Sequence, residues 1–223
     1  MGKMKKADRI KRMKVPAVDP KLAKRLPPGQ VLTERFPILH EGDVPTYDME
    51  KWTLRIFGAV NKEVTLSYDD IMNMKQSSVT CDIHCVTRWS RFDNTFTGVK
   101  FQDFMKELGL EAKGKYVMLH ADPDYTANLA LSDLDREDVL LAHSFENEPL
   151  TDKHGWPLRL VVPHLYFWKS VKWIRGIEFI DENKAGFWEQ NGFHINGDPF
   201  KEERFSGEDL PIPEDEWERK DYD

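Results

Sequence analysis

Cysteine and long apolar runs are both scarce in this chain. Its 223 residues include two cysteines, too few for a disulfide framework, and this usage is typical of a reducing compartment. No run of 18 apolar residues is present, so no membrane-spanning helix is expected. The N-terminus is basic but lacks the apolar segment of a secretory signal. These absences predict a cytoplasmic protein without a membrane span.

Glycine-rich nucleotide-binding loops are absent as well. The sequence contains neither Gly-x-Gly-x-x-Gly nor the Walker phosphate loop, which disfavours the α/β folds that bind nucleotides through such turns. What the chain does have is apolar material: hydrophobic residues make up 40% and aromatic residues 12%. This composition is sufficient for a sizeable core and is unlike that of a disordered chain.

Hydrophobic periodicity predicts an α+β fold that is rich in mixed β-sheet. Trp52, Leu54 and Ile56 alternate with Thr53 and Arg55, as in a half-buried strand. A serine at position 67 precedes an aspartate at position 70 at capping-box spacing, which predicts a short helix through residue 74. Further strands are expected at 63–66, 79–85, 116–119, 139–145, 158–162 and 172–180, and a second helix at 101–108. One domain accounts for all of these elements.

Charge is distributed unevenly along the chain. Residues 1–30 hold ten Lys/Arg and two Asp, a net of +8, whereas the whole chain has a net charge of −7. We therefore predict a basic N-terminal arm at 1–30, a folded domain at 31–207 and an acidic C-terminal tail at 208–223. The acidic body argues against nucleic acid as a partner.

Three segments carry residues suited to a metal and an anionic cofactor. Cys85 lies in the stretch Cys-Asp-Ile-His-Cys-Val-Thr-Arg-Trp-Ser that starts at Cys81. About 70 residues later come His-Gly-Trp-Pro-Leu-Arg, from His154 to Arg159, and then Lys-Ser-Val-Lys-Trp from Lys169. A thiolate is a good ligand for soft metals. Arginine, lysine, serine and backbone N–H groups are the usual ligands of a phosphate.

Together these segments resemble the molybdopterin domain of the sulfite oxidase family, which includes the catalytic subunit of the periplasmic methionine sulfoxide reductase. The resemblance runs from about residue 36 to about residue 205. It implies a sulfite oxidase-type molybdopterin-binding fold, a molybdenum–molybdopterin cofactor and two-electron oxygen-atom transfer on a small sulfur- or nitrogen-centred substrate. It also implies that electrons pass to or from a separate protein.

The resemblance assigns roles to particular residues. Cys85 is the expected molybdenum ligand, and Arg88 is expected in the catalytic pocket. The expected cofactor contacts are His40, Thr87, His154, Arg159, Lys169, Ser170, Val171 and Lys172. Asp122 and Tyr125 fall where the family's loops approach the metal, although a solvated Asp-Pro turn is an alternative for that segment.

Two positions depart from the sulfite oxidase pattern. Ile38 stands where sulfite oxidases carry an arginine, and Phe193 stands where they carry an active-site tyrosine. Both changes remove a polar contact to an oxyanion, because neither side chain has a hydrogen-bond donor. They predict weak sulfite oxidation and a less charged substrate, such as a sulfoxide or an N-oxide.

Two other interpretations stay open at the level of sequence. Cys81, His84 and Cys85 could hold zinc, although a structural zinc site needs four ligands and no second cluster follows. If the segment is a strand, residues 81, 83 and 85 share one face, and Cys81 is then better interpreted as a core residue. The chain could also be a non-catalytic pterin-binding protein that has kept the fold.

Overall fold

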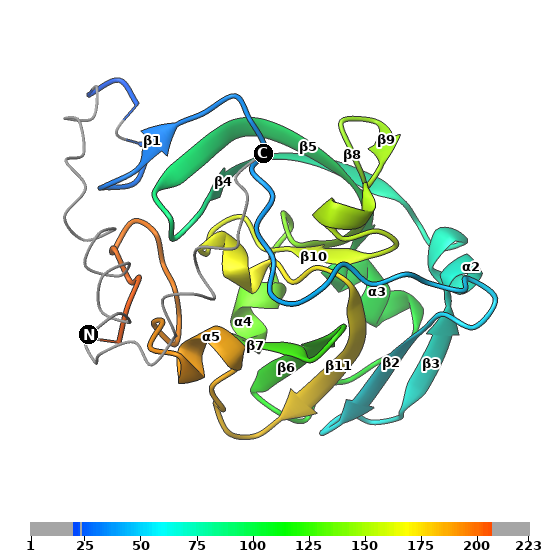
Figure 1. Cartoon of the computed structure of the whole chain (residues 1–223). Coiled ribbons are helices and arrows are strands. Elements are labelled where there is room, and N and C mark those ends of the chain that lie inside the picture. The colour runs from blue at the N-terminus through cyan, green and yellow to red at the C-terminus, as the bar shows by residue number, and fades with distance from the viewer. Residues whose placement is uncertain (1–19, 23, 207–223) are drawn as a thin grey trace.

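A computed structural model describes residues 20–22 and 24–206 of the chain. Most of the expected basic arm and the whole expected acidic tail at 208–223 therefore lie outside the described residues. Within them, two β-sheets form the body (Figure 1). The predicted α+β class with a mixed sheet is confirmed, because parallel and antiparallel pairs occur in both sheets.

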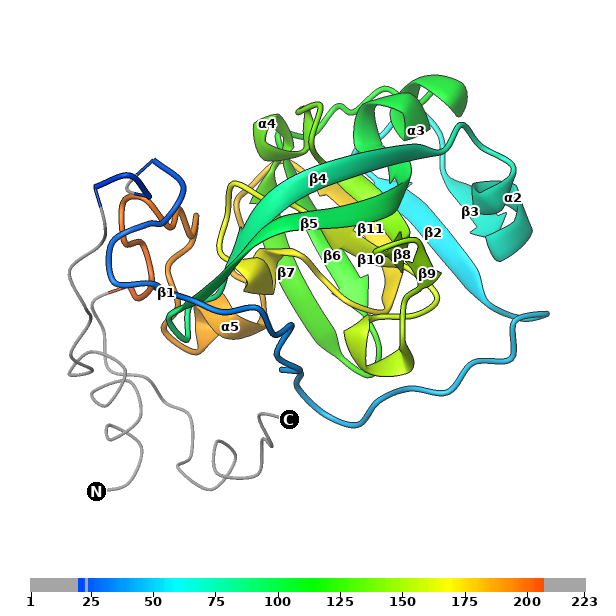
Figure 2. The same cartoon turned by 90° about the horizontal axis from the view of Figure 1, so that it is seen from above.

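The first sheet has the strand order β1-β5-β8-β10, with β4 paired to β5 and β9 paired to β8. Its strands are β1 (Val31–Leu32), β4 (Ser77–His84), β5 (Trp89–Lys100), β8 (Leu140–Phe145), β9 (Glu148–Pro149) and β10 (Arg159–Val161). The long β4–β5 hairpin arches over one side of the body in Figure 2. Its connecting turn carries Cys85.

The second sheet has the order β3-β2-β11-β6-β7. Its strands are β2 (Thr53–Gly58), β3 (Val64–Ser67), β6 (Tyr116–Ala121), β7 (Tyr125–Ala130) and β11 (Ile174–Ile180). Both sheets contribute to one large core, in which Leu54, Leu119 and Ile177 of this sheet meet Leu141 and Leu160 of the first. All five side chains are fully buried.

The helices among the described residues are short. They are α2 (Tyr68–Met72), α3 (Phe101–Glu107), α4 (Leu131–Leu134) and α5 (Phe187–Gln190), with 3₁₀ turns η1 (Asp152–His154) and η2 (Phe167–Lys169). The predicted capping box is present: Ser67 Oγ accepts from the Asp70 N–H at 3.1 Å, and the Asp70 carboxylate accepts from the Ser67 N–H at 2.8 Å. The second predicted helix corresponds to α3, which Gly109 follows with a φ of +57°.

Strands β5 and β7 were not predicted from the sequence. Strand β5 contains Asp93 and Gly98, residues that usually mark turns. Here Asp93 adopts a φ of +55° within the hairpin. Gly98 lies against the neighbouring strand so closely that a Cβ would come within 2.0 Å of Leu141 O. Close pairing with β8, rather than a turn, explains this glycine.

The described part of the expected N-terminal arm is packed against the body. Leu26 and Gln30 are 7% and 2% exposed, and the Arg25 guanidinium donates to Asp82 and Asp93 at 2.6–2.8 Å. The folded body therefore begins before residue 31. From β1 the chain continues without helix or strand to β2, along one side of the molecule (Figures 1 and 2). No helix in the described part of the chain is long and apolar enough to cross a membrane.

Candidate molybdopterin site

One cavity collects most of the residues that the sequence singled out. It lies where the β4–β5 turn, the segments on both sides of β10, the extended segment after β1 and the α5 region meet. Its space is about 900 Å³, including solvent at its mouth. The predicted residues that line it are His40, Cys85, Thr87, His154, Arg159, Ser170, Val171 and Lys172.

Cys85 follows the last residue of β4 and begins a tight turn. Its N–H donates to Trp89 O at 2.9 Å, and its carbonyl accepts from the Arg88 N–H at 3.0 Å. Arg88 closes the turn with a φ of +75°. The turn places the Cys85 sulfur in the cavity with 7% of the residue exposed.

Hydrogen-bond donors gather around the Cys85 sulfur. The Thr87 hydroxyl lies 3.1 Å from Sγ, and the backbone N–H groups of Val86 and Thr87 face the sulfur and favour its thiolate form. Burial raises the pKa of the Cys85 thiol, whereas these donors and the charge of Arg204 oppose the rise. Donors of this kind stabilise a thiolate, the form of cysteine that binds a metal.

The structure separates the three residues that the zinc interpretation requires as ligands. The register of β4 shifts after Cys81, and Cys81 packs with the cluster around Ile83 and Phe96, whereas Cys85 belongs to a different cluster. His84 bonds Ser90 Oγ at 2.8 Å instead. The three residues therefore do not share a site, and residues 20–22 and 24–206 contain no group of three His, Cys, Asp or Glu arranged for a metal ion.

Arg159 is a buried cation at the opposite wall of the cavity. It is 2% exposed, and it donates to His154 O and Ser170 O, both at 2.9 Å. Its guanidinium lies 4.4 Å from the ring centroid of Phe167. Burial lowers the pKa of Arg159 to about 9. Its buried Nε has no hydrogen-bond partner among the described residues, so one N–H donor of this cavity-lining residue is not satisfied by them.

His154 is held as a neutral ring beside Arg159. Its Nε2 lies 3.2 Å from Phe36 O, and its Nδ1 lies 2.9 Å from the Thr151 hydroxyl. Because a carbonyl oxygen only accepts, Nε2 carries the proton and Nδ1 accepts from Thr151. Burial, together with the charges of Arg159 and Lys172, lowers the pKa of His154 to about 4, although the bond to Phe36 O opposes the shift. The ring also stacks on Phe36, with centroids 4.2 Å apart.

Ser170 and Lys172 complete this polar wall. Ser170 Oγ accepts from the Val162 N–H at 2.9 Å, which fixes the loop after η2. Lys172 Nζ donates to Lys153 O at 2.8 Å and lies 4.6 Å from the ring centroid of Trp173. Gly155 makes room for this arrangement, because a Cβ there would lie 3.0 Å from Lys172 Cγ.

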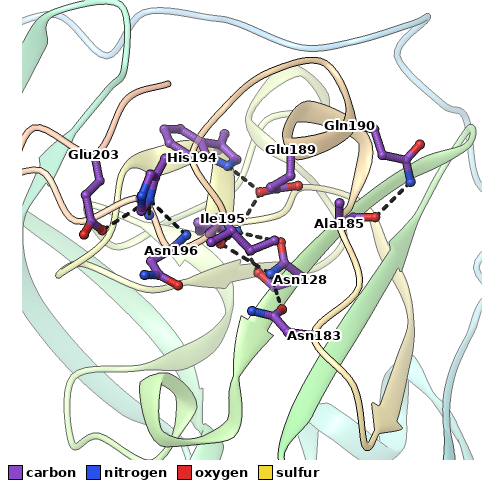
Figure 3. A network of polar contacts seen from close by, with 12 residues as sticks. Asn128, Asn183, Ala185, Glu189, Gln190, His194, Ile195, Asn196 and Glu203 are labelled. Atoms are coloured by element: carbon purple, nitrogen blue, oxygen red, sulfur yellow. Dashed lines mark hydrogen bonds and ion pairs between the residues drawn. The ribbon is translucent and has the colours of Figure 1, made fainter. Parts of the chain in front are cut away.

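Lys169 does not line the cavity, contrary to the role expected from the sequence. Its side chain is 0% exposed and forms an ion pair of 2.6 Å with Glu189, which is 1% exposed. It also donates to Asn128 O, Asn128 Oδ1 and Ile195 O at 2.8–2.9 Å (Figure 3). Its ammonium donors are therefore used within the protein, and these contacts do not support the predicted cofactor contact, which stays a prediction.

Arg88 also departs from its expected place. It is not among the residues that line the cavity. Its Nη1 donates to Gly29 O at 3.2 Å, so the guanidinium points toward the N-terminal segment. The backbone at Arg88 is left-handed, and the expected pocket role stays a prediction that this contact does not support. Asp122, likewise absent from the lining, pairs with Arg175 at 3.3 Å.

The wall near Cys85 is aromatic. Phe193, 3% exposed, stacks on Trp188 with centroids 4.8 Å apart and packs edge-on against Trp168 at 5.0 Å. Trp168 is held by two bonds: its indole N–H donates to Glu189 Oε1 at 2.8 Å, and its carbonyl accepts from the Tyr125 hydroxyl at 2.9 Å. Trp89 and Leu39 pack against the same cluster. Apart from Phe193 and Tyr125, this wall was missed from the sequence, because its members come from distant segments and share no periodicity.

These residues fit a phosphate-bearing, metal-binding cofactor. The cavity is lined by two cationic side chains, Arg159 and Lys172, and by Ser170. It is also lined by Cys85, whose sulfur has hydrogen-bond donors around it. Charge-assisted N–H bonds are strong for phosphate oxygens, and arginine suits them particularly well. The thiolate supplies the soft ligand.

Comparison with known proteins agrees with this geometry. Residues 41–188 match the family model described as "Oxidoreductase molybdopterin binding domain". The chain is 50% identical over 183 residues to an uncharacterised oxidoreductase, YuiH, of Bacillus subtilis (strain 168), covering 82% of this chain and 92% of that protein. It is 30% identical to the mitochondrial sulfite oxidase of Drosophila melanogaster, covering 72% of this chain and 32% of that protein.

Two further similarities concern a reductase and a solved structure. The protein-methionine-sulfoxide reductase catalytic subunit MsrP of Xanthomonas axonopodis pv. citri is 29% identical, over 69% of this chain and 54% of that protein. The crystal structure of the sulfane dehydrogenase SoxCD from Paracoccus pantotrophus covers 69% of this chain and 43% of that chain, with a TM-score of 0.59 and 20% identity. At that identity the likeness shows the fold alone, and the chain spans about a third to a half of the sulfite oxidase and MsrP relatives. The chain therefore belongs to the sulfite oxidase-like family of molybdopterin-binding oxidoreductases, whose cofactor is molybdenum–molybdopterin.

Proposed function

We propose that this oxidoreductase catalyses two-electron oxygen-atom transfer to or from the sulfur or nitrogen of a small molecule, with Cys85 as the protein ligand of molybdenum. One observation carries the proposal. A donor-supported cysteine sulfur and a wall with two cations face the same cavity. This pairing serves a cofactor that presents a metal at one end and a phosphate at the other.

The residues of the polar wall would hold the pterin and its phosphate. Arg159 and Lys172 supply charge, and neutral His154, Ser170 and the backbone around Val171 supply hydrogen bonds. His40 and Thr87 line the same cavity. When bound, the molybdenum supplies an oxidation-state change of two electrons, which is the difficult part of the chemistry. The protein orients the cofactor and sets the charge around it.

The aromatic wall supports a substrate with little charge. Phe193 and Trp168 line the cavity near Cys85 and carry no charge, and Phe193 brings no hydrogen-bond donor, whereas Ile38 is not among the residues that line the cavity. Transfer of an oxyanion such as sulfite into apolar surroundings is costly without donors, whereas a neutral S-oxide or N-oxide is accommodated more easily. The resemblance to a protein-methionine-sulfoxide reductase supports the same class.

Electrons would be exchanged with a separate protein, and the predicted cytoplasmic location stays a prediction. The rival function is pterin binding without catalysis. It differs in one measurable respect, because an enzyme must retain molybdenum and turn over a substrate.

The proposal is tested on protein produced in a molybdenum-replete host. Elemental analysis and pterin fluorescence should give near-stoichiometric molybdenum and pterin. Steady-state kinetics should then show turnover of sulfoxides or N-oxides, with sulfite a poor substrate. Pterin without molybdenum, or full loading without turnover of any sulfur or nitrogen substrate, would favour the non-catalytic rival. A sulfite kcat/KM of about 10⁴ M⁻¹s⁻¹ or more, within the ordinary range for enzymes, would refute the substrate class but not the family.

A further inference from the structure

The turn that carries Cys85 is held from behind by side chains that come from the two ends of the described chain. Gln30 Nε2 donates to Cys85 O and to Trp89 O, both at 3.0 Å. Arg204 Nη1 donates to Val86 O at 2.8 Å. The two side chains are joined, because Arg204 Nη2 donates to Gln30 Oε1 at 3.2 Å and to Pro28 O at 3.1 Å. We call these two residues the Gln30–Arg204 pair.

Both members of the pair are buried. Gln30 is 2% and Arg204 is 4% exposed, and the guanidinium lies 4.8 Å from the ring centroid of Tyr166. Glu202, half exposed, is a weak counter-charge at 3.8 Å from Arg204 Nε. A buried long side chain with a charge is costly to keep unless its bonds are made. Four backbone carbonyls and the Gln30 amide oxygen accept hydrogen bonds from the pair, whereas Arg204 Nε has no hydrogen-bond partner among the described residues.

The bonded carbonyls belong to the same peptide groups that face the sulfur. The peptide that joins Cys85 to Val86 directs its carbonyl to Gln30 and its N–H to Cys85 Sγ. The next peptide directs its carbonyl to Arg204 and its N–H to the same sulfur. Hydrogen bonds in such chains polarise one another. A donor on the carbonyl, and above all a cationic one, therefore strengthens the bond that the N–H makes to sulfur.

We propose that Gln30 and Arg204 are positioning residues that act on the Cys85 sulfur through these two peptide groups. They fix the turn so that its N–H groups meet the sulfur, and the Arg204 charge draws electron density away from it. The inference rests on the proposed role of Cys85 as a metal ligand. Both residues lie outside the segment 41–188 that the family model matches, so the pair is a contribution of the flanking segments of this chain.

The first test measures how tightly the turn is held. Amide hydrogen exchange of the segment 85–89 is compared in the full-length, molybdenum-loaded protein and in Gln30→Met and Arg204→Met. Loss of a buried hydrogen bond, charge-assisted in the second case, should speed local exchange by about 5- to 150-fold. Arg25→Met is the matched control, because Arg25 comes from the same N-terminal segment and bonds Asp82 and Asp93 of the same hairpin without touching the turn. Its exchange in 85–89 should stay at the wild-type rate.

The second test measures the effect on the metal, which a purely structural role would leave unchanged. Hydrogen bonds to ligating sulfurs help set the reduction potential of a metal site. Removing the charge in Arg204→Met should make the molybdenum reduction potential more negative. Arg204→Lys keeps the charge and should stay closer to wild type, although it loses the forked contact and should still exchange faster. If Arg204→Met does not fold, Gln30→Met and Arg204→Lys carry both measurements.

The outcomes separate this inference from the proposed function. Wild-type exchange and wild-type potential in folded Gln30→Met and Arg204 variants would overturn the pair's role. Faster exchange with an unchanged potential would also overturn it, because the pair would then be structural only. An unchanged metal spectrum in Cys85→Ser would instead remove the ligand assignment, and the exchange data would still report whether the pair holds the turn.

Discussion

Replacing Lys172 and Arg159 by methionine should separate cofactor binding from protein stability. Each residue is a cation on the polar wall of the cavity, and each is expected to make a charge-assisted bond to the cofactor. Such a bond contributes about 1.5–3 kcal/mol, or about 10- to 150-fold in affinity. Purified Lys172→Met and Arg159→Met should therefore both contain less pterin than the wild-type protein.

The two variants should differ in their free energy of unfolding. Arg159 is 2% exposed and its guanidinium bonds His154 O and Ser170 O, so its removal leaves two carbonyls without these donors. At about 1–3 kcal/mol for each buried group left unpaired, Arg159→Met should lose about 2–6 kcal/mol. Lys172 is partly exposed and bonds Lys153 O at the surface, and its loss should cost less than about 1 kcal/mol.

The assay needs two measurements on each variant and on the double variant. Pterin content is measured by fluorescence after denaturation, and unfolding of cofactor-free protein is followed in urea. Lys51→Met serves as the control, because this lysine is 83% exposed and pairs only with nearby Asp48 among the interactions described. It should keep full pterin and wild-type stability.

Full pterin occupancy in both single variants and in the double variant would show that the phosphate does not bind at this wall. A loss of pterin in Arg159→Met alone, in proportion to its loss of stability, would show that Arg159 acts through folding and that Lys172 is not a contact.

Four further outcomes are expected. Cys85→Ser should lose most turnover while pterin stays bound, since an alcohol oxygen is a poor substitute for a thiolate on a soft metal; normal turnover, with Cys81→Ser as the active control, would exclude Cys85 as the ligand. Lys169→Met should destabilise the fold by about 3–5 kcal/mol, because it leaves the buried Glu189 carboxylate without its ion-pair partner, and the variant that does fold should bind pterin normally. Loss of pterin without loss of stability in urea would instead support a cofactor contact for Lys169. Phe193→Tyr adds a hydroxyl at the aromatic wall and should raise sulfite kcat/KM relative to sulfoxides; an unchanged ratio would mean that this ring does not face the substrate. Burial lowers the pKa of His143, as it does for His84 and His154, so the unfolded state binds these protons first and stability should fall as pH drops below about 6.5, by less than about 1.4 kcal/mol per pH unit for each residue; His143→Gln should make that slope shallower in urea titrations, and an identical slope would refute the assignment.

The sequence alone determined those features whose chemistry is local. The capping box at Ser67 needs only residues three apart, and it forms as predicted. The Cys85, His154–Arg159 and Ser170–Lys172 motifs each combine residue types within a few positions, so their suitability for a metal and a phosphate could be recognised before the structure was known. Their order along the chain was enough to indicate the family, which comparison with known proteins then confirmed.

Tertiary structure decided which way the side chains within those motifs point. Lys169 and Ser170 are neighbours in sequence, but the 3₁₀ turn at η2 sends the lysine to Glu189 and leaves the serine at the cavity. Arg88 follows the cavity-lining residue Thr87, but its own backbone is left-handed and its side chain bonds Gly29 O. Position in a motif does not fix direction, because direction depends on backbone dihedral angles that neighbouring elements impose.

Contacts between distant segments could not be predicted from any local sequence pattern. Gln30 and Arg204 are 174 positions apart and meet behind the Cys85 turn, and the aromatic wall joins residues from β5, η2 and α5. Neither group has a period or a motif, since its members are brought together only when the two sheets pack and the segments around Gln30 and Arg204 meet the β4–β5 turn. The residue types that do the chemistry are encoded locally, whereas the surroundings that position them arise from long-range packing.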